Sequence, residues 1–294
     1  MTQRKDQMDM FGASLMIGFS VLLGLNQALV KVVNGGFSPI FQSGLRSACA
    51  FLPVLIFALI MKRTLSVSDG SLPWGILLGV FFSLEFSALF IALDYTTVAR
   101  VSLFFYIMPV WVAVAAHFLI PEEPLDRNKV IGLLLCIGGV FLAFSGNLGE
   151  AGEQAWLGDL LALLGGMFWA AIAILTRLKL QGVSSEMNLL YQLAVSAVIL
   201  LLIAPFVEPM IREPTMLIYS VFAFQVIAVV SIGFLIWFWV LSIYPVAKMT
   251  SFGLLTPIFG IFFGWLIFSD PITPTLAIAL LLAGCGIVLV NRPT

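Results

Sequence analysis

Ten apolar stretches follow one another along the chain, separated by short polar joints. A bilayer core of ~30 Å is crossed by ~20 residues of helix, and backbone groups in lipid must bond within their own segment. Each stretch is therefore predicted to be a membrane-spanning helix. Turn residues mark most joints, as in Asn34-Gly35-Gly36 and Asp270-Pro271, whereas the joint at 243–247 is marked by little besides Pro245. The predicted spans are 11–33, 38–61, 72–93, 98–119, 127–145, 157–179, 187–207, 215–242, 246–268 and 273–290.

Composition supports a lipid environment. Of the 294 residues, 61% are hydrophobic and 10% are charged, and the mean hydropathy is +1.12. A soluble domain needs more polar surface than this. The net charge of −1 argues against a nucleic-acid partner. Cys49, Cys136 and Cys285 lie within apolar runs, so we interpret them as packing residues and predict neither a metal site nor a cofactor. The polar start is followed by a full-length span, which argues against a cleaved signal peptide.

Lysine and arginine near the span ends predict the orientation, because cytoplasmic loops carry an excess of both. With the N-terminus in the cytoplasm, ten of the 14 basic residues fall on the cytoplasmic side. Lys31, Arg100 and Arg212 then fall outside, and Arg46 lies within a span. This distribution of basic residues requires an even number of spans, because an odd number would place the two termini on opposite sides of the membrane. We therefore expect a multi-pass protein of the cell membrane (inner or plasma membrane) with both termini cytoplasmic.

The second half of the chain repeats landmarks of the first. The segment 98–100 and Pro109 recur at 246–248 and Pro257, both with an offset of 148. Gly12 and Lys31 match Gly158 and Arg177 with an offset of 146. Each half then holds five spans, and five is odd, so the halves must have opposite topology, as in secondary transporters. Chance similarity between apolar helices is the alternative. The predicted units are 1–146, an outer linker 147–156, and 157–294.

Specific residues carry a family resemblance over nearly the whole chain. They are the segment 24–31 (Gly-Leu-Asn-Gln-Ala-Leu-Val-Lys), Arg46, the segment 92–99 leading to Pro109, and the segment 244–247 leading to Pro257. In these features the chain resembles the EamA-type permeases of the drug/metabolite transporter superfamily. The resemblance implies an all-α membrane fold of ten helices in two inverted five-helix repeats. It also implies export of amino acids, including aromatic ones, or movement of other metabolites and drugs.

Two charged residues lie near the middle of predicted spans, where charge is expensive and therefore suggests function. At 1.5 Å per residue, Glu85 lies ~4 Å and Arg46 ~5 Å outward of the middle of their spans. Equal depth allows a buried ion pair. In the functional interpretation Glu85 takes a proton or meets an ammonium group, and Arg46 meets a carboxylate. In the structural interpretation the pair holds two helices together. The sequence leaves both open.

Polar and aromatic residues at similar depths are candidates for a cavity lining. The candidates are Asn26, Gln27, Gln42, Tyr106, Trp169, Tyr191, Gln192 and Trp237, together with Arg46 and Glu85. Amides at these positions could instead form interhelical hydrogen bonds, and the aromatic residues could be ordinary core. Pro109 and Pro257 each fall near the centre of a span and free a backbone carbonyl. With Gly253 they are the predicted helix breaks or hinges.

These features favour a secondary transporter over other classes. The chain lacks a P-loop, which argues against direct use of ATP, and it lacks clustered catalytic residues, so we predict no enzyme activity. The predicted function is export of amino acids or related small metabolites by alternating access around a midplane cavity. The alternative is a proton-coupled extruder of drugs or organic cations that uses Glu85. The expected partners are the small-molecule substrate and the lipid bilayer. A monomer is the simplest arrangement, and the oligomeric state stays open.

Overall fold

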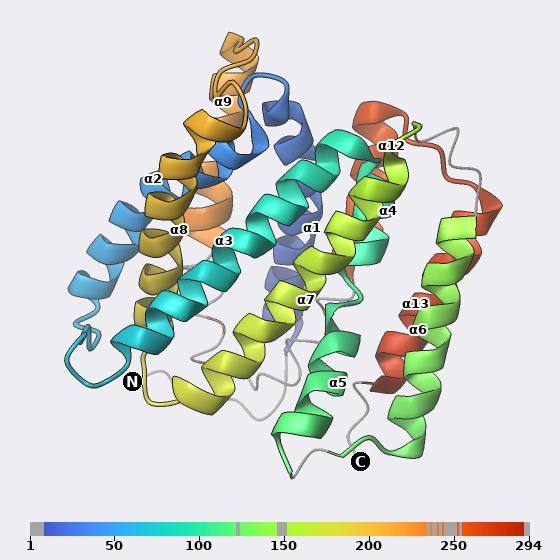
Figure 1. Ribbon diagram of the computed structural model, residues 1–294, viewed down its shortest axis with the longest axis horizontal. Coiled ribbons are helices and arrows are strands. Elements are labelled where there is room, and N and C mark those ends of the chain that lie inside the picture. The colour runs from blue at the N-terminus through green and yellow to red at the C-terminus, as the bar shows by residue number, and fades with distance from the viewer. Residues whose placement is uncertain are drawn as a thin grey trace.

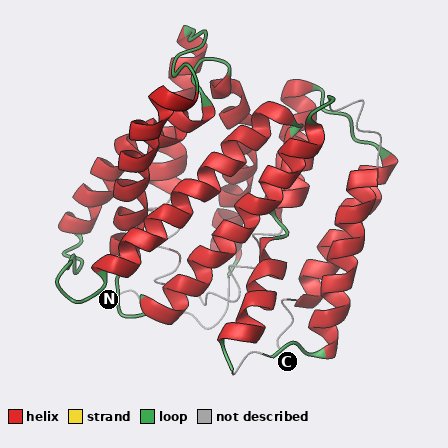
Figure 2. Ribbon diagram, in the orientation of Figure 1, coloured by secondary structure: helices red, strands yellow, loops and turns green. Residues whose placement is uncertain are grey.

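The computed structural model describes residues 9–121, 124–145, 152–233, 236, 240, 243, 252 and 255–290. Within these residues the regular elements are helices, apart from one isolated bridge between Phe37 and Ile211 (Figure 2). The elements are α1 (Met10–Asn34), α2 (Pro39–Ile60), α3 (Leu72–Tyr95), α4 (Val98–Phe105), α5 (Met108–Leu119), α6 (Arg127–Ser145), α7 (Ala155–Lys179), α8 (Ser185–Val207), α9 (Met216–Phe224), the π-helix η2 (Gln225–Gly233), α12 (Leu255–Phe268) and α13 (Pro274–Val290).

Most predicted spans are helices within about two residues of their expected ends, including α6, whose ends match the prediction. Seven described segments are long and apolar enough to cross a membrane, and α12 and α13 are shorter apolar helices. Two spans depart from a single α-helix. The span 98–119 is divided into α4 and α5, and the span 215–242 begins as α9 and continues as η2. The ninth predicted span, 246–268, is described as a continuous helix only from Leu255 onward.

Side-chain caps fix several helix starts, because the first backbone N–H groups of a helix have no partner within it. Asp9 Oδ1 accepts from the backbone of Gly12 at 2.8 Å, and Thr97 caps α4 at 3.2 Å. Ser184 and Thr215 cap α8 and α9 in the same way, each at 3.3 Å. These polar residues stand directly before apolar runs, so the helix boundaries follow from the local sequence.

Helix packing follows the two-fold relation of the halves. The corresponding helices α2 and α8 pack on each other, and so do α6 and α13. The contact of α1 with α12 is mirrored by that of α7 with α4 and α5, and the contact of α3 with α7 is mirrored by that of α1 with α9. In Figure 1, α1 and α7 run in opposite directions. The fold is therefore the expected pair of inverted five-helix repeats. The predicted linker 147–156 is described only from Gly152 onward, so its boundaries stay a prediction.

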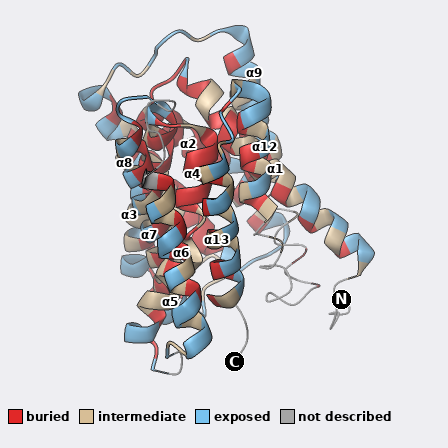
Figure 3. Ribbon diagram, turned by 90° about the vertical axis from the view of Figure 1, so that its right-hand side faces the viewer, coloured by how far each residue is buried: buried red, intermediate tan, exposed pale blue. Residues whose placement is uncertain are grey.

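Apolar side chains cover the outside of the bundle as well as its core. Phe206 and Phe141 are 88% and 74% exposed, and many other large apolar residues are exposed as well. Exposed residues, pale blue in Figure 3, occur along most of the helices. Exposed apolar surface on this scale is favourable in lipid and costly in water. α6 and α13 pack on each other at one edge of the bundle (Figure 1).

Candidate functional site

A cavity of about 90 Å³ lies between the two halves, among α1, α2 and α3 of the first half and α8 and η2 of the second. Its walls are mostly apolar and aromatic, with a few polar groups, which is the usual make-up of a small-molecule site. We call it the central cavity. Its lining residues are Phe19, Leu23, Asn26, Arg46, Ser47, Phe82, Phe86, Leu193, Val229 and Val230.

Arg46 is the charged residue of the central cavity. It is 5% exposed, and its guanidinium lies over the rings of Phe86 and Phe90, with Cζ at 4.4 and 4.7 Å from the ring centroids. Stacking on two aromatic rings stabilises a buried cation and fixes its plane. None of its five N–H donors forms a hydrogen bond or an ion pair with a described residue. A buried, pre-oriented guanidinium with free donors is suited to bind a carboxylate in two-point fashion.

Glu85 lies one residue before Phe86 and is 3% exposed. It is within electrostatic range of Arg46 and of the Tyr106 hydroxyl. A direct ion pair between Glu85 and Arg46 within 4.0 Å is not among the contacts of the described residues. Glu85 also does not line the central cavity. The two charges therefore influence each other without touching, and only Arg46 faces the cavity.

Three amides form a chain beside the cavity. Gln42 Nε2 donates to Gln225 Oε1 at 3.4 Å, and Gln225 Nε2 donates to Asn26 Oδ1 at 3.2 Å. Gln42 and Gln225 are fully buried, and Gln42 Oε1 has no partner among the described residues. Gln225 is not among the residues predicted from the sequence, although a lone amide inside an apolar run could have indicated it. It is also the first residue of η2, and π-helical turns occur often at functional sites.

Gln27 and Tyr106 take part in helix contacts beside the cavity. The Ser102 hydroxyl donates to Gln27 Oε1, which joins α4 to α1. Tyr106 follows α4, and its hydroxyl interacts with the buried Thr256 of α12. Neither side chain lines the cavity. Gln27 thus makes the kind of interhelical hydrogen bond that was left open for the amides, and Tyr106 packs against the core, which was the alternative for the aromatic residues.

The helix break at Pro109 is present. α4 ends at Phe105 and α5 begins at Met108, so Pro109 lies in the first turn of α5, where its missing N–H is not needed. The carbonyl of Phe105 faces α7, because it would lie 2.8 Å from a Cβ added to Gly166. Pro257 lies in the first continuous turn of α12. Gly253 and Trp237 lie outside the described residues.

The remaining candidates lie away from the central cavity. Tyr191 packs against Gly75, and its hydroxyl contacts the Ser71 hydroxyl at 2.8 Å and the Ser66 carbonyl at 3.3 Å. Gln192 donates to the carbonyl of Asn188 in its own helix at 3.2 Å. Trp169 is half-buried and packs against the core formed by α3, α4 and their neighbours. Tyr191 therefore anchors the loop between α2 and α3.

A cluster of ion pairs, here called the upper cluster, joins the two halves at the end that is uppermost in Figure 1. Its most buried pair is Arg100 with Asp159. Arg100 Nε donates to both carboxylate oxygens of Asp159 at 3.0 and 3.1 Å, and Arg100 Nη2 donates as well. The Thr96 hydroxyl donates to the same carboxylate at 3.3 Å. The charged members of the cluster are Lys31, Asp94, Arg100, Asp159, Arg212 and Asp270.

Arg212 connects the loop after α8 to the first half. Its Nη2 lies 2.7 Å from Asp94 Oδ2 and 3.0 Å from Glu208 Oε2, and its Nη1 donates to the carbonyl of Asn34 at 2.9 Å. Lys31 Nζ donates to the carbonyl of Thr96 at 2.7 Å. The Arg212 contacts hold the ends of α1 and α3 against the second half, and the Lys31 contact links α1 to the residue after α3 within the first half.

Asp270 completes the upper cluster by capping α4. Its Oδ2 accepts from the backbone N–H groups of Val98 at 2.8 Å and Ala99 at 3.4 Å. Burial raises the pKa of this carboxyl above its ordinary value, against the opposing effects of the Lys31 charge and the two backbone donors. An acceptor at a helix N-terminus also interacts favourably with the helix dipole. The upper cluster therefore combines ion pairs and a helix cap at one end of the bundle.

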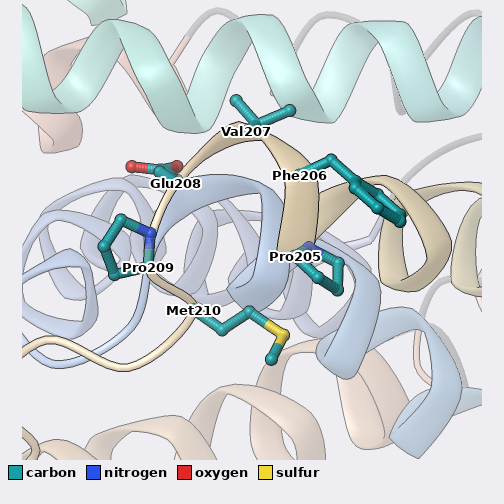
Figure 4. A pocket seen from close by; sticks show the side chains of 6 residues that line it. All are labelled: Pro205, Phe206, Val207, Glu208, Pro209 and Met210. Atoms are coloured by element: carbon teal, nitrogen blue, oxygen red, sulfur yellow. The ribbon is translucent and has the colours of Figure 1, made fainter.

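A larger hollow, of about 470 Å³, lies on the surface at the end of α8 (Figure 4). Six consecutive residues line it, and its one charged group, Glu208, is paired with Arg212. A hollow made by one segment lacks the convergent polar groups of a binding site. We therefore assign the candidate site to the smaller central cavity. Within the described part of the chain, no group of three or more His, Cys, Asp or Glu residues could hold a metal ion.

Known proteins are similar to this chain over nearly its whole length. Uncharacterized transporter YoaV of Bacillus subtilis (strain 168) is 24% identical over 274 residues, which cover 92% of this chain and 93% of YoaV. Uncharacterized transporter YvbV of the same organism is 26% identical over 288 residues, which cover 95% of this chain and 91% of YvbV. A solved crystal structure shares the fold with a TM-score of 0.65 at 20% identity, over 94% of this chain and 95% of that chain.

A sequence model of the EamA-like transporter family matches the chain twice, over residues 10–145 and 156–292. The two matches follow one another and together span nearly all of the helices. The protein therefore belongs to the EamA-like transporter family and is a membrane transporter rather than an enzyme.

Proposed function

We propose that this transporter exports amino acids or related small metabolites, and that the substrate carboxylate binds Arg46 in the central cavity. The observation that carries the proposal is the buried guanidinium of Arg46, which stacks on two aromatic rings and lines the cavity without a hydrogen-bonding partner among the described residues. Charge-assisted, two-point binding to arginine selects a carboxylate by geometry as well as by charge.

The rest of the cavity supports the same substrate class. Phe19, Phe82 and Phe86 supply aromatic walls for an apolar or aromatic side chain, and Asn26 and Ser47 supply neutral polar groups for an ammonium. Aromatic faces also attract an ammonium group directly. The resemblance to amino-acid exporters supports export as the direction.

Transport is proposed to occur by alternating access. The cavity volume of about 90 Å³ is below the ~300–1,000 Å³ of typical ligand sites, so loading requires the helices around it to separate. Rocking of one half against the other around a fixed midplane site is the usual motion of inverted-repeat transporters. We place both termini in the cytoplasm of a cell-membrane protein, which makes the end with the upper cluster the outer end.

Counterflow in proteoliposomes tests the proposal. Vesicles are loaded with unlabelled phenylalanine, and uptake of labelled phenylalanine is followed without an ion gradient. We expect transient accumulation with the wild type, a KM raised at least tenfold in Arg46→Gln, and a smaller rise in Arg46→Lys, which keeps the charge but loses the two-point geometry. Arg127→Gln is the matched control, because Arg127 is exposed at the start of α6. Counterflow unaffected by Arg46→Gln would refute the assigned site.

A second candidate is a proton-coupled extruder of organic cations that uses Glu85. The observation in its favour is that Glu85 is buried and forms no hydrogen bond or ion pair among the described residues. In that case tetraphenylphosphonium would move in response to a pH gradient, and Glu85→Gln would abolish that movement. The absence of Glu85 from the cavity lining makes this the weaker candidate.

A further inference from the structure

Glu85 is a carboxyl group that, among the described residues, has a single cation within electrostatic range. It is 3% exposed on α3, and the groups within electrostatic range are Arg46 on α2 and the Tyr106 hydroxyl after α4. Its carboxylate accepts no hydrogen bond from the described residues. A buried carboxylate that lacks donors is stable only beside a positive charge. Arg46 therefore decides whether Glu85 can remain ionised.

The other charged residues on helices that pack against α3 are engaged elsewhere. Asp159 on α7 pairs with Arg100 on α4, and Glu186 on α8 pairs with Arg63. Lys31 on α1 donates to the carbonyl of Thr96. At the far end of α7, Lys179 lies over the ring of Trp74, and Arg177 lies two residues before it. These groups sit near the helix ends, whereas Glu85 and Arg46 lie in the middle of theirs.

Arg46 stands between Glu85 and the central cavity. Its guanidinium lines the cavity, and Glu85 does not. With the cavity empty, the positive and negative charges balance. When a substrate carboxylate binds Arg46, the guanidinium is shared between that carboxylate and Glu85, while the substrate ammonium is held on the cavity side by the neutral groups Asn26 and Ser47. Binding a proton to Glu85 ends this sharing and removes the repulsion between the two carboxylates, because like charges at low dielectric repel strongly.

We infer that each substrate carboxylate bound at Arg46 is accompanied by one proton on Glu85, so that the carrier moves substrate and proton together. This inference rests on the proposed function. On loading, a proton from the same compartment adds to a carboxylate oxygen of Glu85. On release, the substrate leaves Arg46, Glu85 regains its counter-charge, and the proton departs to the other compartment. No group other than the proton is gained or lost.

This coupling has a consequence for export. A proton that leaves with the substrate moves against the inward proton gradient of a respiring cell. Outward flow then needs a substrate gradient large enough to offset it, and an acidic exterior slows it. The carrier would therefore export substrate only when the substrate has accumulated to a high concentration inside the cell. A zwitterionic amino acid would carry one net positive charge in each cycle.

The test measures proton and substrate movement in the same proteoliposomes. The full-length protein is reconstituted with an internal pH-sensitive dye, and valinomycin with K⁺ prevents a voltage from building up. Adding phenylalanine outside is expected to acidify the interior, with about one proton for each molecule taken up. Uptake of phenylalanine without acidification would overturn the inference and leave the proposed function intact. Absence of both uptake and counterflow in the wild type would overturn both.

Glu85→Gln is the diagnostic variant, since the amide resembles the protonated carboxyl in shape and charge. We expect counterflow of phenylalanine to persist within about threefold, and the associated proton movement and its pH dependence to be lost. Glu153→Gln is the matched control, because Glu153 is exposed just before α7. Proton movement that persists in Glu85→Gln would overturn the inference. If that variant does not fold, the ratio of protons to substrate in the wild type decides alone.

Discussion

Removal of the Asp159 carboxylate should destabilise the protein through the partner that it leaves behind. The side chain of Asp159 is fully buried, and that of Arg100 is 10% exposed. Asp159→Ala therefore strands a guanidinium that has lost its carboxylate, and the Thr96 hydroxyl loses the same acceptor. Breaking a buried pair from one side costs about 3–5 kcal/mol, most of which is the cost of the uncompensated charge.

The double variant Arg100→Met with Asp159→Leu provides the comparison. Replacing both members of a buried ion pair with apolar residues of similar volume is often neutral or stabilising, by up to about 4 kcal/mol. We therefore expect the double variant to be more stable than Asp159→Ala, and close to the wild type. The Thr96 hydroxyl remains without its acceptor in both variants, which makes it a shared loss.

Equilibrium unfolding in mixed detergent micelles, followed by circular dichroism, would measure these free energies. Both single variants and the double variant form a double-mutant cycle, which isolates the interaction between the two residues. A loss below about 1 kcal/mol for Asp159→Ala would be typical of a solvated surface pair and would refute the buried pairing. A double variant as unstable as the sum of the single variants would refute the role of the stranded charge.

Three further predictions concern packing, anchoring and pH. A Cβ on Gly24 would lie 2.6 Å from the Cβ of Phe259, whereas a Cβ on Gly18 in the same helix meets nothing within 4 Å. In the same unfolding assay, Gly24→Ala should lower the free energy of unfolding by about 1–3 kcal/mol, and Gly18→Ala should leave it unchanged or raise it. Tyr191→Phe should lower stability by about 1 kcal/mol through its lost hydrogen bonds and leave the counterflow KM unchanged, and a raised KM would place Tyr191 in the substrate path. The folded-state pKa of Asp270 is raised above 3.8, so its contribution to stability is largest at acidic pH and falls as the pH rises through the folded value. Asp270→Asn keeps a capping oxygen and should therefore gain stability relative to the wild type as the pH rises. A stability difference between the two that stays constant from pH 4 to 8 would contradict this.

The fold could be predicted because lipid leaves few choices. The apolar run 127–145 is bounded by charged and turn residues, and α6 occupies the same range. Pro109 indicated the division of the fourth span, because a proline within a helix removes one backbone bond. The π-helix η2 was not predicted, since the apolar segment that forms it resembles an α-helix in composition.

The site could be predicted only in part. Arg46 and Asn26, which line the central cavity, and Gln42, which lies beside it, were selected because a polar group inside a span is expensive wherever it points. Asp159 and Gln225 were missed because their importance depends on partners 59 and 183 residues away in the sequence. Tyr191 was selected for its expected depth in the membrane. Its hydroxyl instead reaches the loop before α3, since the repeat register predicts depth in the membrane and does not predict direction.

Competition in the counterflow assay tests the central claim most directly, using three molecules that share one phenyl side chain. Labelled phenylalanine is challenged with 3-phenylpropionate, which lacks the ammonium, and with phenylethylamine, which lacks the carboxylate. If Arg46 receives a carboxylate, 3-phenylpropionate should compete and phenylethylamine should not. Competition by phenylethylamine alone would contradict the account and would favour an extruder of organic cations.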